Sequence, residues 1–250
     1  MNDLKQRLDK EYEARNTVFE LSEDKPDPLF AVKKYLDSKY ISEIALICAL
    51  LSYGNAKQIL KTLLSIDFNV IDNREAILNT SFPLYRFQTR DDIKNIFLCM
   101  HDIIENGGIK NIFLDSYNKE NNVLFGINAM IESLRNRVEL TNGLDFLIGR
   151  KSIKSSASSP LKRWNMFLRW LVRKDNIDIG IWGDRVSTKH LILPLDTHTF
   201  KVSKKLGLLN RKSYDLQSAL EITDNLAKFD KDDPIKYDFA LYRIGQEKII

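Results

Sequence analysis

The stretch Pro194-Leu195-Asp196-Thr197-His198-Thr199-Phe200-Lys201-Val202 joins an extended apolar run to a helical pattern. The helical pattern runs from Thr197 to Leu206, so Asp196 occupies the position of a helix N-cap. Gly207 follows the last helical residue and is predicted to close the helix as a C-terminal cap. A carboxylate in this position caps the backbone and remains available for chemistry, which makes Asp196 the first candidate for a functional residue.

A second helix is predicted upstream, after a small polar loop at 151–159. Ser159 occupies the N-cap position and Pro160 the first helical position of a pattern that continues to Val172. Apolar residues at 164, 167, 168 and 171 share one face of this helix. Near the end of the chain, Asp233-Pro234 is predicted to open a third helix and Gly245 to end it.

The rest of the chain also follows helical patterns. Tyr40–Leu51, with Ser42 as its predicted cap, becomes apolar all round, which is typical of a helix at the centre of a core. Further helices are predicted at 56–66, 91–105 and 123–138. No segment alternates with a period of two, and ten glycines and six prolines are few for 250 residues. The residues therefore predict an all-α fold.

The distribution of charge along the chain says more about possible partners than the net charge does. A net charge of +4 is too small to imply a nucleic-acid partner by itself. Between Phe146 and Lys174, however, there are eight basic residues and no acidic one: Arg150, Lys151, Lys154, Lys162, Arg163, Arg169, Arg173 and Lys174. Such a block fits a phosphate backbone or a solvated helix face, and the residues leave both interpretations open.

The compartment and the cofactors are predicted from what the sequence lacks. Met1–Gln6 has no apolar core of the signal-peptide kind, and the longest apolar stretch, Ile44–Leu51, is too short to cross a bilayer, so we expect a cytoplasmic protein without a membrane partner. Cys48 and Cys99 lie in apolar runs and are expected to be buried free thiols. Two cysteines cannot hold a four-cysteine iron–sulfur cluster, and His198 has no second ligand at helical spacing. We predict no cofactor and no metal.

The segment around Asp196 resembles the part of helix-hairpin-helix DNA glycosylases, the endonuclease III class, that carries the essential aspartate. The matching residues are Leu195, Asp196, Thr197, His198, Lys201, Val202, Leu206 and Gly207. Pro160-Leu161-Lys162-Arg163 is similar to the element that carries the lysine of bifunctional members. Ile44–Ser52 is similar to the helix that precedes the residues filling the gap left by a flipped base.

A second resemblance spans the whole chain. The runs Lys162–Trp170, Leu193–His198 and Asp233–Leu241 resemble a bacterial family known only as a domain of unknown function. That family implies no activity, so the resemblance to glycosylases remains the only indication of function.

The resemblance to glycosylases implies a role for each matching residue. Asp196 would be the catalytic carboxylate and Lys162 the catalytic amine. The predicted DNA contacts are Tyr53, Asn55, Ser158, Ser159, Arg163, His198 and Lys201. Cleavage of an N-glycosidic bond builds positive charge on the sugar, which a nearby carboxylate stabilises. A lysine that attacks the sugar must be neutral, which requires a lowered pKa.

The resemblance also implies a two-lobed fold, with one lobe at 40–176 and the other formed by 1–39 and 177–250. The function predicted from it is a DNA-binding protein and DNA N-glycosylase, with or without lyase activity. It would act on a damaged base in double-stranded DNA without an obligate protein partner. The loop Ser155-Ser156-Ala157-Ser158-Ser159 stands where the family has a Gly-x-Gly hairpin. Two alternatives therefore stay open, a non-catalytic nucleic-acid binder that kept this fold and a protein-partner scaffold. The lesion, and the choice between DNA and RNA, are not predicted.

Overall fold

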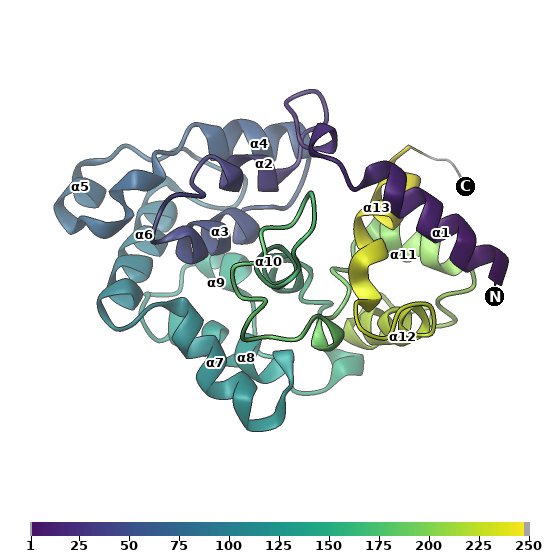
Figure 1. Ribbon diagram of the computed structural model, residues 1–250. Coiled ribbons are helices and arrows are strands. Elements are labelled where there is room, and N and C mark those ends of the chain that lie inside the picture. The colour runs from purple at the N-terminus through teal and green to yellow at the C-terminus, as the bar shows by residue number, and fades with distance from the viewer. Residues whose placement is uncertain (1, 248–250) are drawn as a thin grey trace. The chain divides into compact units, whose positions relative to one another are not determined.

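A computed structural model describes residues 2–247 of the chain, and the regular elements within that range are all helices (Figure 1). The only β pairings among these residues are two isolated bridges, Tyr85 with Gln88 and Lys174 with Ile179. The predicted all-α fold class is therefore confirmed. None of the described helices has the length and apolarity that a bilayer-spanning segment needs.

The chain forms two compact units. The first, which we call the middle unit, covers Leu21–Lys151. Its helices are α2 (Pro28–Lys33), α3 (Ile41–Leu50), α4 (Ala56–Leu64), η2 (Phe68–Asp72), α5 (Arg74–Asn79), α6 (Arg90–Glu105), α7 (Ile109–Glu120), α8 (Val123–Arg135) and α9 (Asn142–Ile148).

The second unit, which we call the composite unit, combines the residues up to Glu20 with those from Ser152 onward. Its helices are α1 (Asn2–Arg15), η1 (Val18–Glu20), η3 (Ser155–Ala157), α10 (Lys162–Val172), η4 (Thr188–His190), α11 (Thr197–Lys205), α12 (Leu216–Ala227), η5 (Pro234–Tyr237) and α13 (Asp238–Gln246). Within this unit α1, from the start of the chain, lies beside α13, from its end (Figure 1).

The bounds of the two units differ from those predicted for the two lobes. The structure divides the chain at 20/21 and 151/152, whereas the predicted lobes divide it at 39/40 and 176/177. The main difference is α10, which belongs to the composite unit. Buried ion pairs explain this membership, because Arg169 of α10 and its C-cap Arg173 pair with Asp238 and Asp233 near the end of the chain.

Helix α3 forms the centre of the middle unit. Every residue from Glu43 to Leu50 is buried, in agreement with its apolar sequence. The predicted cap Ser42 is wrong, because the N-cap is Tyr40. A turn sets this earlier start: Ser38 accepts a hydrogen bond at its side chain from the Tyr40 N–H and at its carbonyl from the Ile41 N–H.

Two helix boundaries in the composite unit also differ from the predicted ones. Helix α10 begins at Lys162, preceded by Leu161 with a φ of 53°, and not at Pro160 with Ser159 as the cap. A left-handed residue cannot continue a helix, so Leu161 ends the preceding loop. At the other end of the chain, Gly245 lies inside α13 instead of ending it. A Cβ at position 245 would lie 2.9 Å from a methyl carbon of Val202 and 3.0 Å from the Cβ of His198, so this glycine allows α13 to approach α11 closely.

Candidate functional site

An extended, buried segment delivers Asp196 to the start of α11. Residues Leu191 to Leu195 are buried and belong to no helix. The Leu193 N–H donates to the Thr223 hydroxyl on α12 at 3.0 Å, and the Tyr214 hydroxyl donates to the Leu195 carbonyl at 2.7 Å. These two bonds satisfy polar groups of a buried irregular segment, which would otherwise cost free energy. They hold the backbone in place immediately before Asp196.

The two carboxylate oxygens of Asp196 have different surroundings. Oδ1 accepts a 2.7 Å hydrogen bond from the Thr199 N–H, so Asp196 caps α11 as predicted. Oδ2 lies 3.8 Å from the Nζ of Lys162. The side chain of Asp196 is 13% exposed and that of Lys162 is 33% exposed, so both groups are partly exposed to solvent. The capping bond holds the carboxylate in one orientation and leaves its second oxygen facing an amine.

The start of α10 determines where Lys162 lies. Leu161 is buried with a positive φ of 53°, an uncommon conformation for a residue with a β-carbon. One turn into the helix, Asn165 donates from its side-chain amide to the Pro160 carbonyl at 3.1 Å. The Asn165 N–H also bonds to the Leu161 carbonyl at 3.0 Å. Asn165 thus fixes the turn before Lys162 through both its side chain and its backbone. This turn places the lysine in the first turn of α10.

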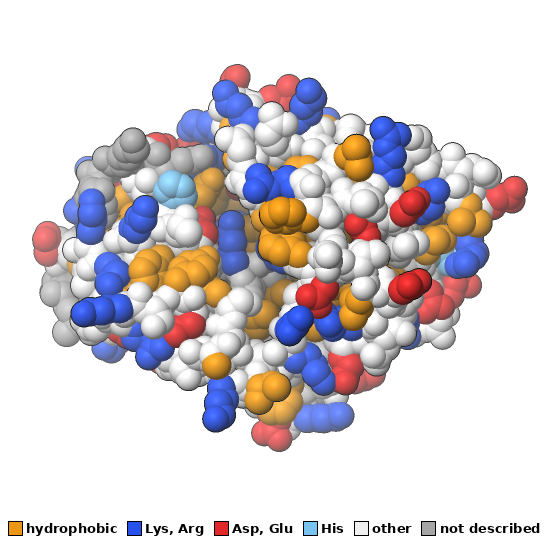
Figure 2. Space-filling model, turned by 180° about the vertical axis from the view of Figure 1, so that it is seen from behind, with side chains coloured by type: hydrophobic (Ala, Val, Ile, Leu, Met, Phe, Trp, Pro, Cys, Tyr) orange, Lys and Arg blue, Asp and Glu red, His pale blue; other side chains and the backbone are white. Residues whose placement is uncertain are grey.

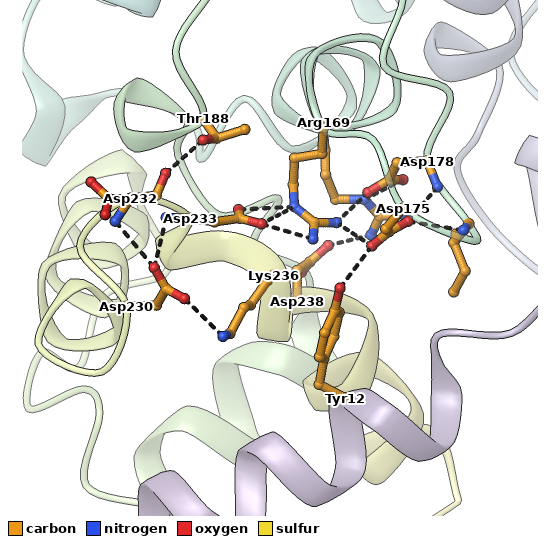
Figure 3. A network of polar contacts seen from close by, with 12 residues as sticks. Tyr12, Arg169, Asp175, Asp178, Thr188, Asp230, Asp232, Asp233, Lys236 and Asp238 are labelled. Carbon is orange, nitrogen blue, oxygen red and sulfur yellow. Dashed lines mark hydrogen bonds and ion pairs between the residues drawn. The ribbon is translucent and has the colours of Figure 1, made fainter. Parts of the chain in front are cut away.

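A buried network of ion pairs lies farther along α10 (Figure 3). Arg169 pairs with Asp178 at 3.2 Å and with Asp238 at 2.5 Å. Arg173 pairs with Asp178 at 2.5 Å, with Asp175 at 3.0 Å and with Asp233 at 2.9 Å. Both guanidinium groups are almost completely buried. The network ties α10 to the loop that follows it and to the start of α13.

Burial and charge shift the pKa values of several groups in this network. Burial raises the pKa of Asp238 to about 6, against the pull of Arg169, and the negative charge of Asp196 adds to the increase. Burial also raises the pKa of the Tyr214 hydroxyl, and Asp196 again adds to the effect. Asp196 is therefore close enough to both groups to influence their protonation, and the network and the site share one electrostatic environment.

We expect Asp238 to make the stability of the protein depend on pH between about 4 and 7. The folded protein binds a proton at Asp238 near pH 6, whereas an ordinary aspartate binds one only near 3.8. Protonated Asp238 therefore stabilises the fold at low pH, and this contribution is lost as the pH rises through about 6. From pH 4 to pH 7, the free energy of unfolding of the wild type should fall relative to that of Asp238→Asn by on the order of 2–3 kcal/mol. Urea denaturation at each pH measures this difference, and parallel curves for the two proteins would contradict the assignment.

The remaining predicted DNA contacts of the composite unit lie on α10, on α11 and in the loop before α10. Arg163 follows Lys162 in the first turn of α10 and is half-buried. His198 and Lys201 are exposed on α11. Ser158 donates from its hydroxyl to the Lys154 carbonyl at 2.8 Å, and its own carbonyl accepts from the Leu216 N–H at 3.0 Å. Ser159 is exposed. The serine loop is therefore held against the start of α12 through its backbone.

The predicted base-gap residues Tyr53 and Asn55 belong to the middle unit. Asn55 caps α4, because its side-chain oxygen accepts from the N–H groups of Lys57 and Gln58. Tyr53 donates its hydroxyl to Gln88, and the Arg86 guanidinium lies 5.5 Å from the centre of its ring. Both residues have a structural role in this unit, and their predicted contact with DNA remains a prediction.

Sequence reasoning missed two features of the site. Tyr214 was not singled out, although it bonds to the residue before Asp196. The segment Thr197–Tyr214 contains five basic residues and no acidic one, namely Lys201, Lys204, Lys205, Arg211 and Lys212. Its three lysines on α11 are all exposed. Over the composite unit, which Figure 2 shows from behind, lysine and arginine side chains surround an apolar patch. The excess of basic residues between Thr197 and Tyr214 is visible in the sequence and could have predicted that this surface is basic.

Candidate metal ligands do not cluster in the described part of the chain. No group of three or more His, Cys, Asp or Glu side chains within residues 2–247 has the arrangement of a metal site. Cys48 and Cys99 are buried free thiols, as expected from their apolar surroundings.

Fold and site together define an all-α protein with a partly exposed aspartate–lysine pair beside a basic helix. The model of one protein family matches residues 27–247, and the description of that family is "Protein of unknown function (DUF2400)". The chain belongs to this family. No curated protein and no solved structure matches the chain.

Proposed function

We propose that this protein is a DNA N-glycosylase that removes a damaged base from double-stranded DNA, with Asp196 and Lys162 as its catalytic groups. The observation that carries the proposal is the 3.8 Å separation between the Lys162 Nζ and the Asp196 Oδ2. The two residues are 34 positions apart in the sequence (196 − 162) and come from different helices. Their partial exposure supports contact with a substrate.

The pair matches the charge that develops when an N-glycosidic bond breaks. The sugar carbon becomes positive as the base leaves with the bonding electrons, and the Asp196 carboxylate stabilises this charge. In a lyase reaction the Lys162 amine bonds to the same carbon, and Asp196 accepts the proton that the amine loses. In a hydrolytic reaction Asp196 accepts the proton of the attacking water instead.

The surrounding charges support a polyanionic substrate. Arg163 lies next to Lys162, and the exposed Lys201, Lys204 and Lys205 lie on the helix that Asp196 caps. Lysine and arginine side chains neutralise phosphates and release bound counterions, which favours binding to a nucleic acid. A base must also leave the stack to reach such a pair, at a cost of a few kcal/mol that is lowest for a damaged or mispaired base.

A panel of duplex oligonucleotides, each with one damaged base, tests the proposal. We expect the wild type to release the base from at least one of them. If the lyase route operates, borohydride should trap a covalent adduct with the wild type but none with Lys162→Ala. Lys189→Ala removes an exposed lysine of the same unit and is the matched control, with base release and trapping as in the wild type.

Two other results would replace the proposal by an alternative. Salt-dependent binding that Lys162→Ala and Arg163→Ala weaken, with no base released from any lesion, would indicate a non-catalytic nucleic-acid binder. The structural feature that favours this alternative is the loop Ser155–Ala157, a 3-10 turn in the place of the glycine hairpin. Failure to bind DNA at low salt would favour a protein-partner scaffold.

A further inference from the structure

Tyr214 lies immediately beside the candidate site but belongs to no predicted motif. It stands in the loop between α11 and α12, 18 residues after Asp196 (214 − 196). Its hydroxyl donates a 2.7 Å hydrogen bond to the carbonyl of Leu195, the residue before Asp196. The residue is 43% exposed, and its ring packs edge-on against the ring of Phe200, with 5.6 Å between the ring centres. Tyr214 therefore touches the chain on both sides of Asp196, at Leu195 before it and at Phe200 after it.

The backbone at Leu195 needs such a support. Leu195 is buried in a segment without regular structure, so a carbonyl left without a partner there would cost free energy. The chain changes direction at the next residue, because Asp196 is extended, with φ −113° and ψ 179°, and α11 begins at Thr197. A shift of the Leu195 carbonyl would move the Asp196 backbone and with it the carboxylate that faces Lys162.

From these contacts we infer that Tyr214 is a positioning residue of the site, which holds the Asp196 carboxylate at its place opposite Lys162. Its hydroxyl acts through the Leu195 carbonyl, and its ring acts through Phe200 in the first turns of α11. The catalytic part of this inference rests on the proposed function. The positioning itself does not, because it concerns the conformation of the free protein.

Electrostatics agree with this geometry. Burial and the negative charge of Asp196 both raise the pKa of the Tyr214 hydroxyl. The hydroxyl therefore stays protonated near neutral pH and can only serve as the donor in its bond to Leu195. A hydroxyl that always donates can hold the Leu195 carbonyl in one position.

The amide of Thr199 reports on the position of Asp196 without any substrate. Its N–H donates to the Asp196 Oδ1 at 2.7 Å, so a displaced carboxylate would expose it to exchange. We expect Tyr214→Phe, which keeps the ring, to accelerate hydrogen exchange at Thr199 by about fivefold to tenfold, as for the loss of one hydrogen bond. Tyr35→Phe is the matched control, because Tyr35 donates its hydroxyl to the Ile66 carbonyl in the middle unit. It should leave exchange at Thr199 unchanged.

The same variant has a catalytic readout on whichever oligonucleotide the wild type cleaves. A misplaced carboxylate should lower kcat for base release roughly 10- to 100-fold and leave KM within about twofold.

These readouts separate the inference from the proposed function. If no oligonucleotide is cleaved, the proposed function fails, and exchange at Thr199 still decides whether Tyr214 positions Asp196. The inference is overturned if Tyr214→Phe exchanges at Thr199 like the wild type. Its catalytic part is overturned if base release by Tyr214→Phe keeps the kcat of the wild type.

Discussion

Replacing Arg173 by alanine is expected to lower the free energy of unfolding by about 3–5 kcal/mol, because it leaves buried carboxylates without their cation. Arg173 pairs with Asp175, Asp178 and Asp233. Asp178 is 4% exposed and would keep only Arg169 as a partner. Urea denaturation of the wild type and the variant at neutral pH measures the loss.

An exposed ion pair is the matched control for this prediction. Arg137 pairs with Asp102 at 2.8 Å, but the two side chains are 31% and 51% exposed. Exposed pairs of this kind contribute about 0–1 kcal/mol, so Arg137→Ala should have a small effect. A loss for Arg173→Ala as small as that of the control would show that the network contributes little to stability.

The largest effect on activity is expected from Asp196→Asn. Asparagine keeps the size of the side chain and removes the charge, so it cannot accept the proton of the attacking amine or water. Loss of a positioned general base lowers the rate by about 10²- to 10⁴-fold. Asparagine caps helices about as well as aspartate, so the bond from the Thr199 N–H and the start of α11 should be retained. Base release and thermal unfolding of the same preparation measure the two effects.

Asp27→Asn separates the loss of a catalytic charge from the loss of a capping charge. Asp27 caps α2 in the middle unit, where its side chain accepts from the Leu29 N–H at 2.9 Å. This variant should show activity like that of the wild type. Base release by Asp196→Asn at the rate of the wild type would exclude Asp196 as the catalytic carboxylate.

Local sequence signals predicted those parts of the fold that depend on neighbouring residues. Asp196 was predicted as a cap and is one, because its side chain needs only the N–H three residues later. Gly207 was predicted at the C-terminal end of the same helix, and its φ is +71°, a conformation that glycine adopts without strain. The apolar run Ile44–Leu51 was predicted as a core helix, and it is buried throughout.

Predictions failed where distant residues determine the backbone. Gly245 was predicted as a helix end, but it lies inside α13, where His198 and Val202 of α11 leave no room for a side chain. The start of α10 was predicted at Pro160, but Leu161 adopts a positive φ next to the Asn165 bond to the Pro160 carbonyl. Glycine and proline predict the ends of helices only where no tertiary contact requires another backbone geometry.

The sequence by itself determined the helical class of this protein, the cap at Asp196 and the identity of the two groups proposed to react. Each depends on a periodicity or a short motif, and both are local. Only the tertiary structure decided that Lys162 faces Asp196 at 3.8 Å, that Tyr214 bonds to Leu195, and that two buried arginines join α10 to the end of the chain. These contacts join residues from 19 to 69 positions apart, and no local pattern specifies which side chains meet across such distances.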